Sequence, residues 1–177
     1  MKEKQEKKVI YISSMGGHLK ELLALKKSMK KFKSYIITEK TEATSFLKEL
    51  EKGKPEENNK SDVNDAFFEK VYYLPYGTKK NIIKYLFIFI AMIIKSIYLL
   101  IRIRPKAIVT TGTHTAVPIC YIGKLFGCKI IYIETFANIT TKTLAGKIVY
   151  PIADKFIVQW ETMKKLYPKA DYYGGIF

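Results

Sequence analysis

Short apolar runs rich in β-branched and aromatic residues alternate along this chain with longer stretches in which apolar residues recur every three or four positions. The short runs predict strands over residues 9–12, 35–38, 69–74, 107–111, 129–134, 156–160 and 171–177. The longer stretches predict helices over residues 19–29, 44–51, 79–104, 116–126, 143–153 and 161–167. Strands that alternate with helices predict an α/β fold: a parallel sheet with helices on both faces and ligands at the carboxyl ends of its strands.

Length and composition fit one domain. A chain of 177 residues with 48% hydrophobic content can fill one substantial core, and neither a repeat nor a linker marks a boundary. We therefore expect a single domain over residues 1–177. The polar residues 52–65 are expected to form a loop. The first residues lack the features of a signal peptide, which predicts a location in the cytoplasm or on its membrane face.

The chain is strongly basic. Its formal net charge of +15 favours an anionic partner such as nucleic acid, acidic lipid or a diphosphate-bearing substrate, but a genome of low G+C content would also enrich lysine without functional meaning. The cations lack the interleaved aromatic residues of a nucleic-acid stacking platform, so that partner is disfavoured. Cys120 and Cys128 lie in apolar segments far from any CxxC or histidine-rich cluster, which predicts buried free thiols and no metal site.

The helix predicted at residues 79–104 is almost entirely apolar. It approaches the roughly 20 apolar residues that a spanning helix needs, but two lysines interrupt it. These lysines and a later arginine form a narrow cationic stripe on an otherwise apolar cylinder, so we expect the helix to associate with a membrane in its headgroup plane. The alternatives are a buried crossover helix and a spanning helix. The residues expected to meet the membrane are Lys84, Phe87, Ile90, Lys95 and Arg102.

A glycine-containing loop joins the first predicted strand to the first helix. Ser14, Gly16 and Gly17 would let an anion such as a phosphate approach the backbone N–H groups at the start of that helix. His18 follows directly, as a general base, an anion donor or simply a helix-start residue. The chain contains neither GxGxxG nor a GKS/GKT P-loop, so dinucleotide-binding and P-loop functions are disfavoured.

Two further features follow later strands. Thr111, Gly112, Thr113 and His114 form a small-residue loop that opens a helix after the fourth strand, and Glu134 ends the fifth. Because the carboxyl ends of parallel strands share one edge, both loops and Glu134 are expected to face one cleft. Glu134 would either take part in chemistry there or cap the next helix, and His114 would either join the site or cap its own helix.

Together these motifs resemble a known family. The order SSMGGHLKELLAL, a hydrophobic helix and then TTGTHTAVPICYIGKLFGCKIIYIETFAN is similar to the oligosaccharide-biosynthesis family of acceptor-domain subunits. That family includes the PssD/CpsF-type proteins of bacterial exopolysaccharide and capsule assembly and the membrane-anchoring subunit of the eukaryotic dolichol-pathway N-acetylglucosaminyltransferase. It resembles in turn the N-terminal half of MurG-like GT-B glycosyltransferases, which implies a Rossmann-like domain equivalent to that half.

The resemblance also implies a function. The chain would be the membrane-associated acceptor-side subunit of a two-component glycosyltransferase, and a separately encoded subunit would hold the UDP-sugar. The sugar would pass to a polyprenyl-diphosphate-linked saccharide in polysaccharide or capsule biosynthesis. Such a hexosyltransferase would be inverting, independent of metals and cofactors, inactive without its partner, and peripheral or monotopic on an anionic cytoplasmic membrane face. The alternative is a non-catalytic membrane anchor or activator that recruits the catalytic subunit.

Site residues carry over from the family by position. His18 is the candidate base that deprotonates the acceptor hydroxyl, because imidazole titrates near neutrality, and Glu134 is the second catalytic candidate. The last segment of the chain is expected either to dock the partner subunit or to form a final core strand. The candidate interface residues there are Tyr172, Tyr173, Ile176 and Phe177. The residues expected to bind the acceptor diphosphate are Ser14, Gly16, Gly17, Thr111, Gly112 and Thr113.

Overall fold

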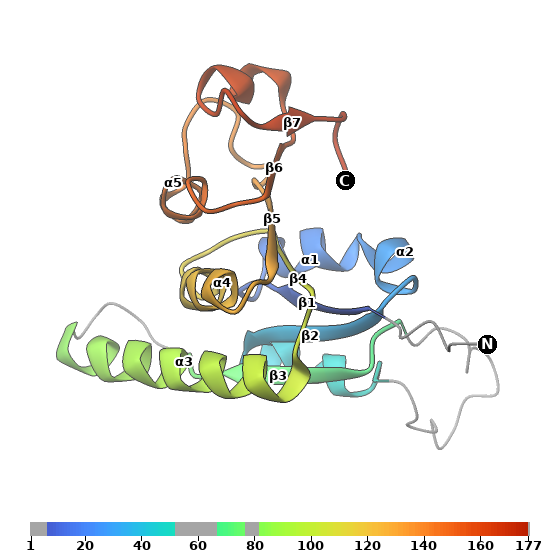
Figure 1. Ribbon diagram of the computed structural model, residues 1–177, viewed down its shortest axis with the longest axis vertical. Helices are drawn as coiled ribbons and strands as arrows, with labels where there is room; N and C mark the ends of the chain where they lie inside the picture. Colours follow the sequence, from blue (N-terminus) through green and yellow to red (C-terminus); the bar gives the residue numbers. More distant parts are fainter. Residues whose placement is uncertain (1–6, 52–66, 77–81, 177) are drawn as a thin grey trace.

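Parallel strands form the centre of the molecule (Figure 1). The computed structural model describes residues 7–51, 67–76 and 82–176, and in them a seven-stranded sheet has the order β3-β2-β1-β4-β5-β6-β7. Every neighbouring pair of strands is parallel. The strands are β1 (Lys8–Ile12), β2 (Lys33–Glu39), β3 (Lys70–Leu74), β4 (Ala107–Thr110), β5 (Lys129–Ile133), β6 (Lys155–Val158) and β7 (Asp171–Tyr172). The predicted strands are present, although the run at 171–177 pairs over its first two residues only.

Helices connect the strands. They are α1 (Gly17–Leu23), α2 (Lys26–Met29), α3 (Ile82–Ile103), α4 (Ala116–Leu125) and α5 (Leu144–Val149), with 3₁₀-helices η1 (Glu42–Lys48) and η2 (Glu161–Lys165). The helix predicted at 19–29 is divided, because the backbone leaves the helical conformation at Leu25 before α2 begins. Leu22 and Met29 nevertheless stay fully buried. The loop predicted at 52–65 and the start of the helix predicted at 79 lie outside the described residues.

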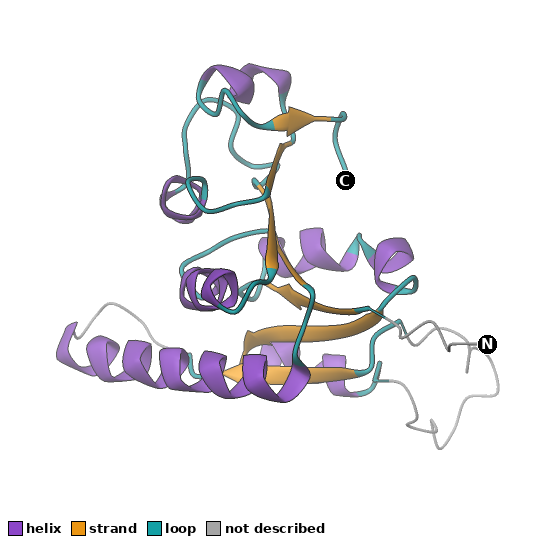
Figure 2. Cartoon of the chain, in the orientation of Figure 1, coloured by secondary structure: helices purple, strands orange, loops and turns teal. Residues whose placement is uncertain are grey.

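The sheet has a hydrophobic core on each face. Alternate side chains of a strand point to opposite faces, and in β1 Val9 and Tyr11 join one buried cluster while Ile10 and Ile12 join the other. The first cluster lies under α1 and α2, and the second under α3, α4 and α5. Figure 2 shows helices on both sides of the sheet. The predicted α/β fold with helices on both faces of a parallel sheet is therefore confirmed.

Helix α3 has two apolar faces with different surroundings. One face is buried on α4 and the sheet through Met92, Ser96, Leu99, Leu100 and Ile103. The other face is exposed; Phe87 and Ile90, for example, have 69% and 44% of their surface accessible. Arg104 then adopts a left-handed conformation with φ 54° before Pro105, which ends the helix where the sequence predicted.

The N-terminal half of α3 extends past the other helices (Figure 1). No side chain between Tyr85 and Ala91 is buried, although the segment is almost entirely apolar. Residues Tyr85–Ile103 are long and apolar enough to cross a membrane, and 28% of that stretch is buried in the protein. By length and composition this stretch is a candidate membrane span, a test that the core helix of a soluble protein also passes. The side chain of Lys84 lies outside the described residues, whereas Lys95 is half-buried and Arg102 is exposed.

Candidate functional site

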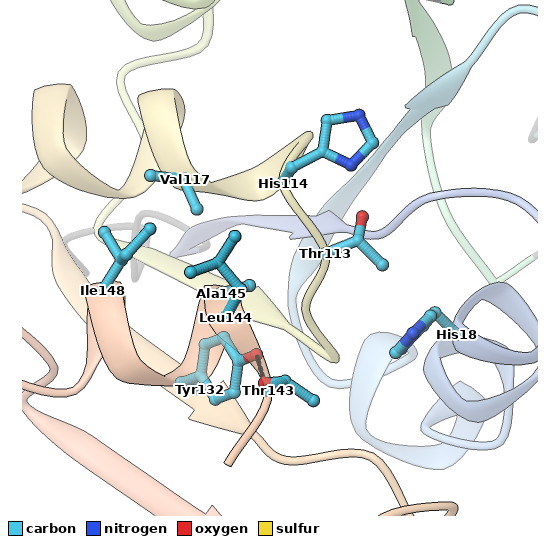
Figure 3. Close-up of a pocket in the computed structure, with 9 residues that line it drawn as sticks. All are labelled: His18, Thr113, His114, Val117, Tyr132, Thr143, Leu144, Ala145 and Ile148. Carbon is cyan, nitrogen blue, oxygen red and sulfur yellow. Dashed lines mark hydrogen bonds between the residues drawn. The ribbon is translucent and has the colours of Figure 1, made fainter. Parts of the chain in front are cut away.

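A pocket of about 240 Å³ opens at the carboxyl ends of β1, β4 and β5. Between β1 and β4 the strand order reverses, and ligands of doubly wound sheets bind at that switch point. Figure 3 shows His18 of α1 on one side of the pocket and residues of α4 and α5 on the other. The lining residues are His18, Thr113, His114, Val117, Tyr132, Thr143, Leu144, Ala145 and Ile148. Two of the predicted site residues, His18 and Thr113, thus meet in one pocket with His114.

The loop after β4, residues 111–114, holds His18 through two hydrogen bonds. Its Nδ1 lies 2.9 Å from the backbone carbonyl oxygen of Thr111, and the Thr111 hydroxyl donates to the carbonyl oxygen of His18 at 2.7 Å. A carbonyl oxygen only accepts, so Nδ1 of the neutral ring carries the proton. The other ring nitrogen, Nε2, then carries a lone pair with no partner among the described residues. This tautomer suits a general base.

The same loop after β4 brings a residue with a strained backbone, Thr113, to the pocket. Thr113 has φ 77°, a left-handed conformation that is costly for a β-branched residue, and its buried hydroxyl has no hydrogen-bond partner among the described residues. Gly112 before it has φ 101°, and a Cβ there would lie 2.6 Å from the Tyr132 hydroxyl. Strain and an unpaired polar atom at one residue are features of ligand-binding sites.

Glu134 is buried behind the pocket, with 1% of its surface exposed. Its carboxylate accepts hydrogen bonds from the Thr143 hydroxyl at 2.9 and 3.0 Å, the Tyr167 hydroxyl at 2.8 Å and the Thr135 N–H at 3.1 Å. Thr143 in turn caps α5 by accepting from the N–H of Gly146 at 2.9 Å. Burial and the bond to Glu134 raise the pKa of Tyr167. The carboxylate thus holds α5 in place, and it does not line the pocket.

The loop between β1 and α1 lies at the rim of the pocket. Gly16 and Gly17 are exposed, and Gly16 has φ 84° with open space where a Cβ would project. Ser14 is buried and donates to the neighbouring carbonyl of Met15 at 3.4 Å. Neither these residues nor Gly112 line the pocket. Within the described part of the chain, no three His, Cys, Asp or Glu side chains are grouped so that they could hold a metal ion.

Sequence reasoning missed the apolar wall of the pocket. Val117 of α4 and Leu144 and Ile148 of α5 form it, with the Tyr132 hydroxyl 3.3 Å from Thr143 at its base. Burial raises the pKa of Tyr132, and the nearby carboxylate of Glu134 raises it further, so this phenol stays neutral. The signal was weak: a threonine at the start of a helix is a common N-cap, but it does not reveal which strand that helix will cover.

Comparisons with known proteins identify the family to which this chain belongs. The family model described as "Oligosaccharide biosynthesis protein Alg14 like" matches residues 8–176. The chain belongs to this family. The UDP-N-acetylglucosamine transferase subunit ALG14 of Mus musculus is 30% identical over 188 residues, which cover 96% of this chain and 82% of the mouse protein. The ALG14 subunit of Rattus norvegicus is 29% identical over 180 residues, covering 95% and 82%.

Solved structures share the fold of this Alg14-like chain. The crystal structure of Acinetobacter baumannii MurG superimposes with a TM-score of 0.70 at 14% identity and covers 96% of this chain. The UDP-N-acetylglucosamine 2-epimerase of Rickettsia bellii superimposes with a TM-score of 0.67 at 13% identity. The chain spans 45% of the MurG structure and 46% of the epimerase. The predicted similarity to one half of a MurG-like protein is therefore confirmed at the level of the fold.

Proposed function

We propose that this Alg14-like chain is the membrane-associated acceptor-side subunit of a two-component glycosyltransferase. A separate subunit would hold UDP-N-acetylglucosamine, the donor named in the relatives, and the sugar would pass to a polyprenyl-diphosphate-linked saccharide on the cytoplasmic membrane face. The product would serve polysaccharide or capsule assembly. The observation that carries the proposal is the composition of the pocket. One side holds His18, whose Nε2 is available, and the other side is an apolar wall. That wall lies on the same side of the sheet as α3.

Exposed apolar side chains on this side of the sheet support contact with a bilayer. Large exposed hydrophobic residues are unusual on a soluble protein when they gather on neighbouring helices. Two of them, Leu144 and Ile148, also line the pocket, so a polyprenyl chain could pass from the bilayer into the pocket along apolar surface. The large hydrophobic residues exposed on α3, α4 and α5, and at the residue that follows α4, are Leu86, Phe87, Ile90, Ile94, Ile97, Tyr98, Ile101, Tyr121, Leu125, Phe126, Leu144 and Ile148.

The diphosphate of the acceptor would lie between the apolar wall and the two loops. The unpartnered hydroxyl of Thr113 and the ring of His114 line the pocket and can donate to phosphate oxygens. Gly16 and Gly17 leave open space at the rim, where no Cβ would obstruct a phosphate. We assign acceptor binding to these groups, with Ser14, Thr111 and Gly112 shaping the loops.

His18 would act as the base. As the acceptor hydroxyl attacks the anomeric carbon of the donor, its O–H proton passes to Nε2 of His18 and a glycosidic C–O bond forms. The bond from the anomeric carbon to the phosphate oxygen breaks, and its electron pair leaves with UDP. Attack from the face opposite the leaving group inverts the anomeric configuration. No step needs a metal from this chain.

The partner subunit would dock near the end of the chain. Tyr172 and Tyr173 are exposed, and exposed aromatic residues are common anchors of interfaces. Tyr173 is already ordered by Lys155, whose ammonium donates to its hydroxyl at 2.6 Å. Ile176 is half-buried, and its N–H donates to Gln159 Oε1 at 2.9 Å, so it belongs partly to the core. Phe177 lies outside the described residues.

The test measures sugar transfer to a polyprenyl-diphosphate-linked acceptor. The sample is the complex of this chain with its donor-binding subunit, in membranes. His18→Ala should lower transfer at least about tenfold, the low end for a general base when water can substitute. Lys20→Ala, an exposed change on the same helix, is the control. Co-purification with the partner should survive in both. Normal turnover of His18→Ala would overturn the catalytic role and support the non-catalytic anchor instead.

A second measurement asks whether transfer needs both subunits. The chain alone should show no transfer, because a single Rossmann-like domain supplies one wall of a two-domain cleft. Activity should appear when the donor-binding subunit is added. Robust transfer by the chain alone would contradict the two-component proposal.

A further inference from the structure

Glu21 ties the helix of His18 to the loop after β5. It lies one turn further along α1, and its Oε1 accepts hydrogen bonds from the Thr135 hydroxyl at 2.8 Å and the Phe136 N–H at 3.0 Å. These contacts join residues more than 110 positions apart in the sequence. They need one acceptor oxygen, and an amide side chain would provide that oxygen equally well.

The second carboxylate oxygen of Glu21, Oε2, is unusual in its surroundings. Oε2 is buried and has no hydrogen-bond partner among the described residues. It lies 3.8 Å from Nδ1 of His18, and the Glu21 side chain is 13% exposed. A buried acceptor without a partner costs free energy, so structure alone does not favour a carboxylate at this position.

Nδ1 of His18 faces two acceptors and no donor. The Thr111 carbonyl oxygen lies 2.9 Å away and Glu21 Oε2 lies 3.8 Å away. Both favour a proton on Nδ1, which leaves the lone pair on Nε2. A carboxylate at this distance also attracts the positive charge that the ring gains when Nε2 takes up a proton.

We propose that Glu21 is a positioning residue for the transfer reaction. It fixes the tautomer in which Nε2 is basic and stabilises the imidazolium that forms as the acceptor hydroxyl loses its proton. The proton stays on Nε2, the Nδ1 proton stays in place, and no proton passes to Glu21, as none passes to the aspartate of a catalytic triad. The inference rests on the proposed role of His18 as the base.

Glu21→Gln separates the charge of this side chain from its structural contacts. Glutamine keeps an Oε1 acceptor for Thr135 and Phe136 but has no charge, and it turns an NH₂ donor toward the Nδ1 proton. In the complex with the donor-binding subunit, kcat should fall about tenfold to a hundredfold with KM for the acceptor nearly unchanged, because the charge matters when the ring becomes positive. Glu49→Gln, the same change at an exposed position away from the pocket, should leave both constants unchanged.

Thr135→Val is the complementary variant. It removes one donor of the Glu21 bridge and keeps the carboxylate charge. It should lower kcat much less than Glu21→Gln. Equal losses in the two variants, or wild-type kcat in Glu21→Gln, would overturn the proposal, since the bridge rather than the charge would then be what matters. Thermal unfolding of both variants shows whether the fold is retained.

A double-mutant cycle distinguishes the inference from the proposed function. If Glu21 acts through His18, Glu21→Gln should cause no further loss in the His18→Ala background. Losses that multiply would refute the positioning role while leaving His18 as the base. Normal turnover in His18→Ala would refute the base itself. A purely structural Glu21 would lower the activity of both backgrounds by the same factor.

Discussion

The ring of Tyr85, on the projecting half of α3, packs against the ring of His114 with centroids 6.1 Å apart and planes tilted by 48°. One residue comes from the exposed apolar helix and the other lines the pocket. The two rings therefore join α3 to the pocket by direct contact. If α3 rests on a bilayer, the same contact fixes how far the pocket lies from the lipid headgroups.

The exposed face of α3 should control membrane association. Replacing Phe87 and Ile90 together by aspartate places two charges on side chains that are already exposed, so the fold should be kept. Charges on an apolar face oppose insertion among lipid tails. The double variant should move from the membrane fraction to the soluble fraction, measured by fractionation with circular dichroism of the purified protein.

Phe46→Asp supplies the matched control. Phe46 is an exposed aromatic residue of η1, outside the apolar surface of α3, α4 and α5. This variant should stay with the membrane fraction. A folded Phe87/Ile90 double variant that still sediments with membranes would show that α3 does not carry the attachment.

Gly146→Ala should destabilise the wall of the pocket. A Cβ at Gly146 would come closer than 3.0 Å to oxygens of Glu134, Tyr167 and Thr143, which are held by their mutual hydrogen bonds. Overpacking of this kind costs about 2 kcal/mol of the free energy of unfolding. Chemical denaturation measures it. Gly17→Ala, where nothing lies within 4 Å of the added methyl group, should change stability by less than about 1 kcal/mol.

Sequence patterns predicted the sheet, and they predicted that the two loops meet at one edge of it, because both depend on local order. Strand, loop and helix follow one another around His18 and again around Thr113, and the carboxyl ends of parallel strands must meet. The contacts that complete the site are long-range. Glu21 reaches Thr135, and Tyr167 reaches Glu134, across distances in the sequence that no periodicity encodes. These contacts depend on how the connections pack on the finished sheet.

The sequence predicted only in part which side chains of α3 are buried and which are exposed. Apolar residues nearly all round the helix favoured membrane contact over a buried helix, but the sequence could not divide its circumference between a face packed on the protein and a face left exposed. In the structure Leu99 and Met92 are covered, whereas Phe87 is not. The division follows from where α4 lies, which the hydrophobic pattern of α3 does not contain.

Asp154→Asn should lower stability in a pH-dependent way. Burial acts to raise the pKa of Asp154, but hydrogen bonds from Lys124 at 2.7 Å, the Ile130 N–H at 2.9 Å and Lys129 at 3.0 Å outweigh it and hold the pKa well below its usual value. A depressed folded-state pKa contributes stability above the unfolded-state pKa of about 3.9, and that contribution is lost as the pH falls. The variant should unfold with about 1 kcal/mol less free energy at pH 7.

The difference between wild type and Asp154→Asn should shrink as the pH drops below about 4. Denaturant titrations at pH 7 and pH 3 measure it. Asp171→Asn, which removes the exposed pair between Asp171 and Lys155 at 3.5 Å, should have a smaller effect at neutral pH. A pH-independent difference for Asp154→Asn would contradict the assignment.

The two thiols should resist alkylation in the folded protein. Burial raises the pKa of Cys120 to about 12, and it also raises the pKa of Cys128 against the opposing charge of Lys106. At pH 8 the thiolate of Cys120 would be present in only about one molecule in 10⁴. Iodoacetamide should label neither thiol until denaturant is added, whereas a Ser45→Cys variant provides an exposed thiol that reacts at once. Mass spectrometry of native samples checks this, and native labelling of Cys120 would contradict its burial.

The pairing of β1 with β4 has a consequence for biosynthesis. Val9 pairs with Ala107, so the middle of the sheet joins strands on either side of α3 in the sequence. A nascent chain leaves the ribosome from its N-terminus, and α3 therefore emerges before β4 and α4 exist to cover its inner face. During that interval its inner apolar face is uncovered together with its outer one, so attachment of the nascent chain to a bilayer can precede completion of the sheet.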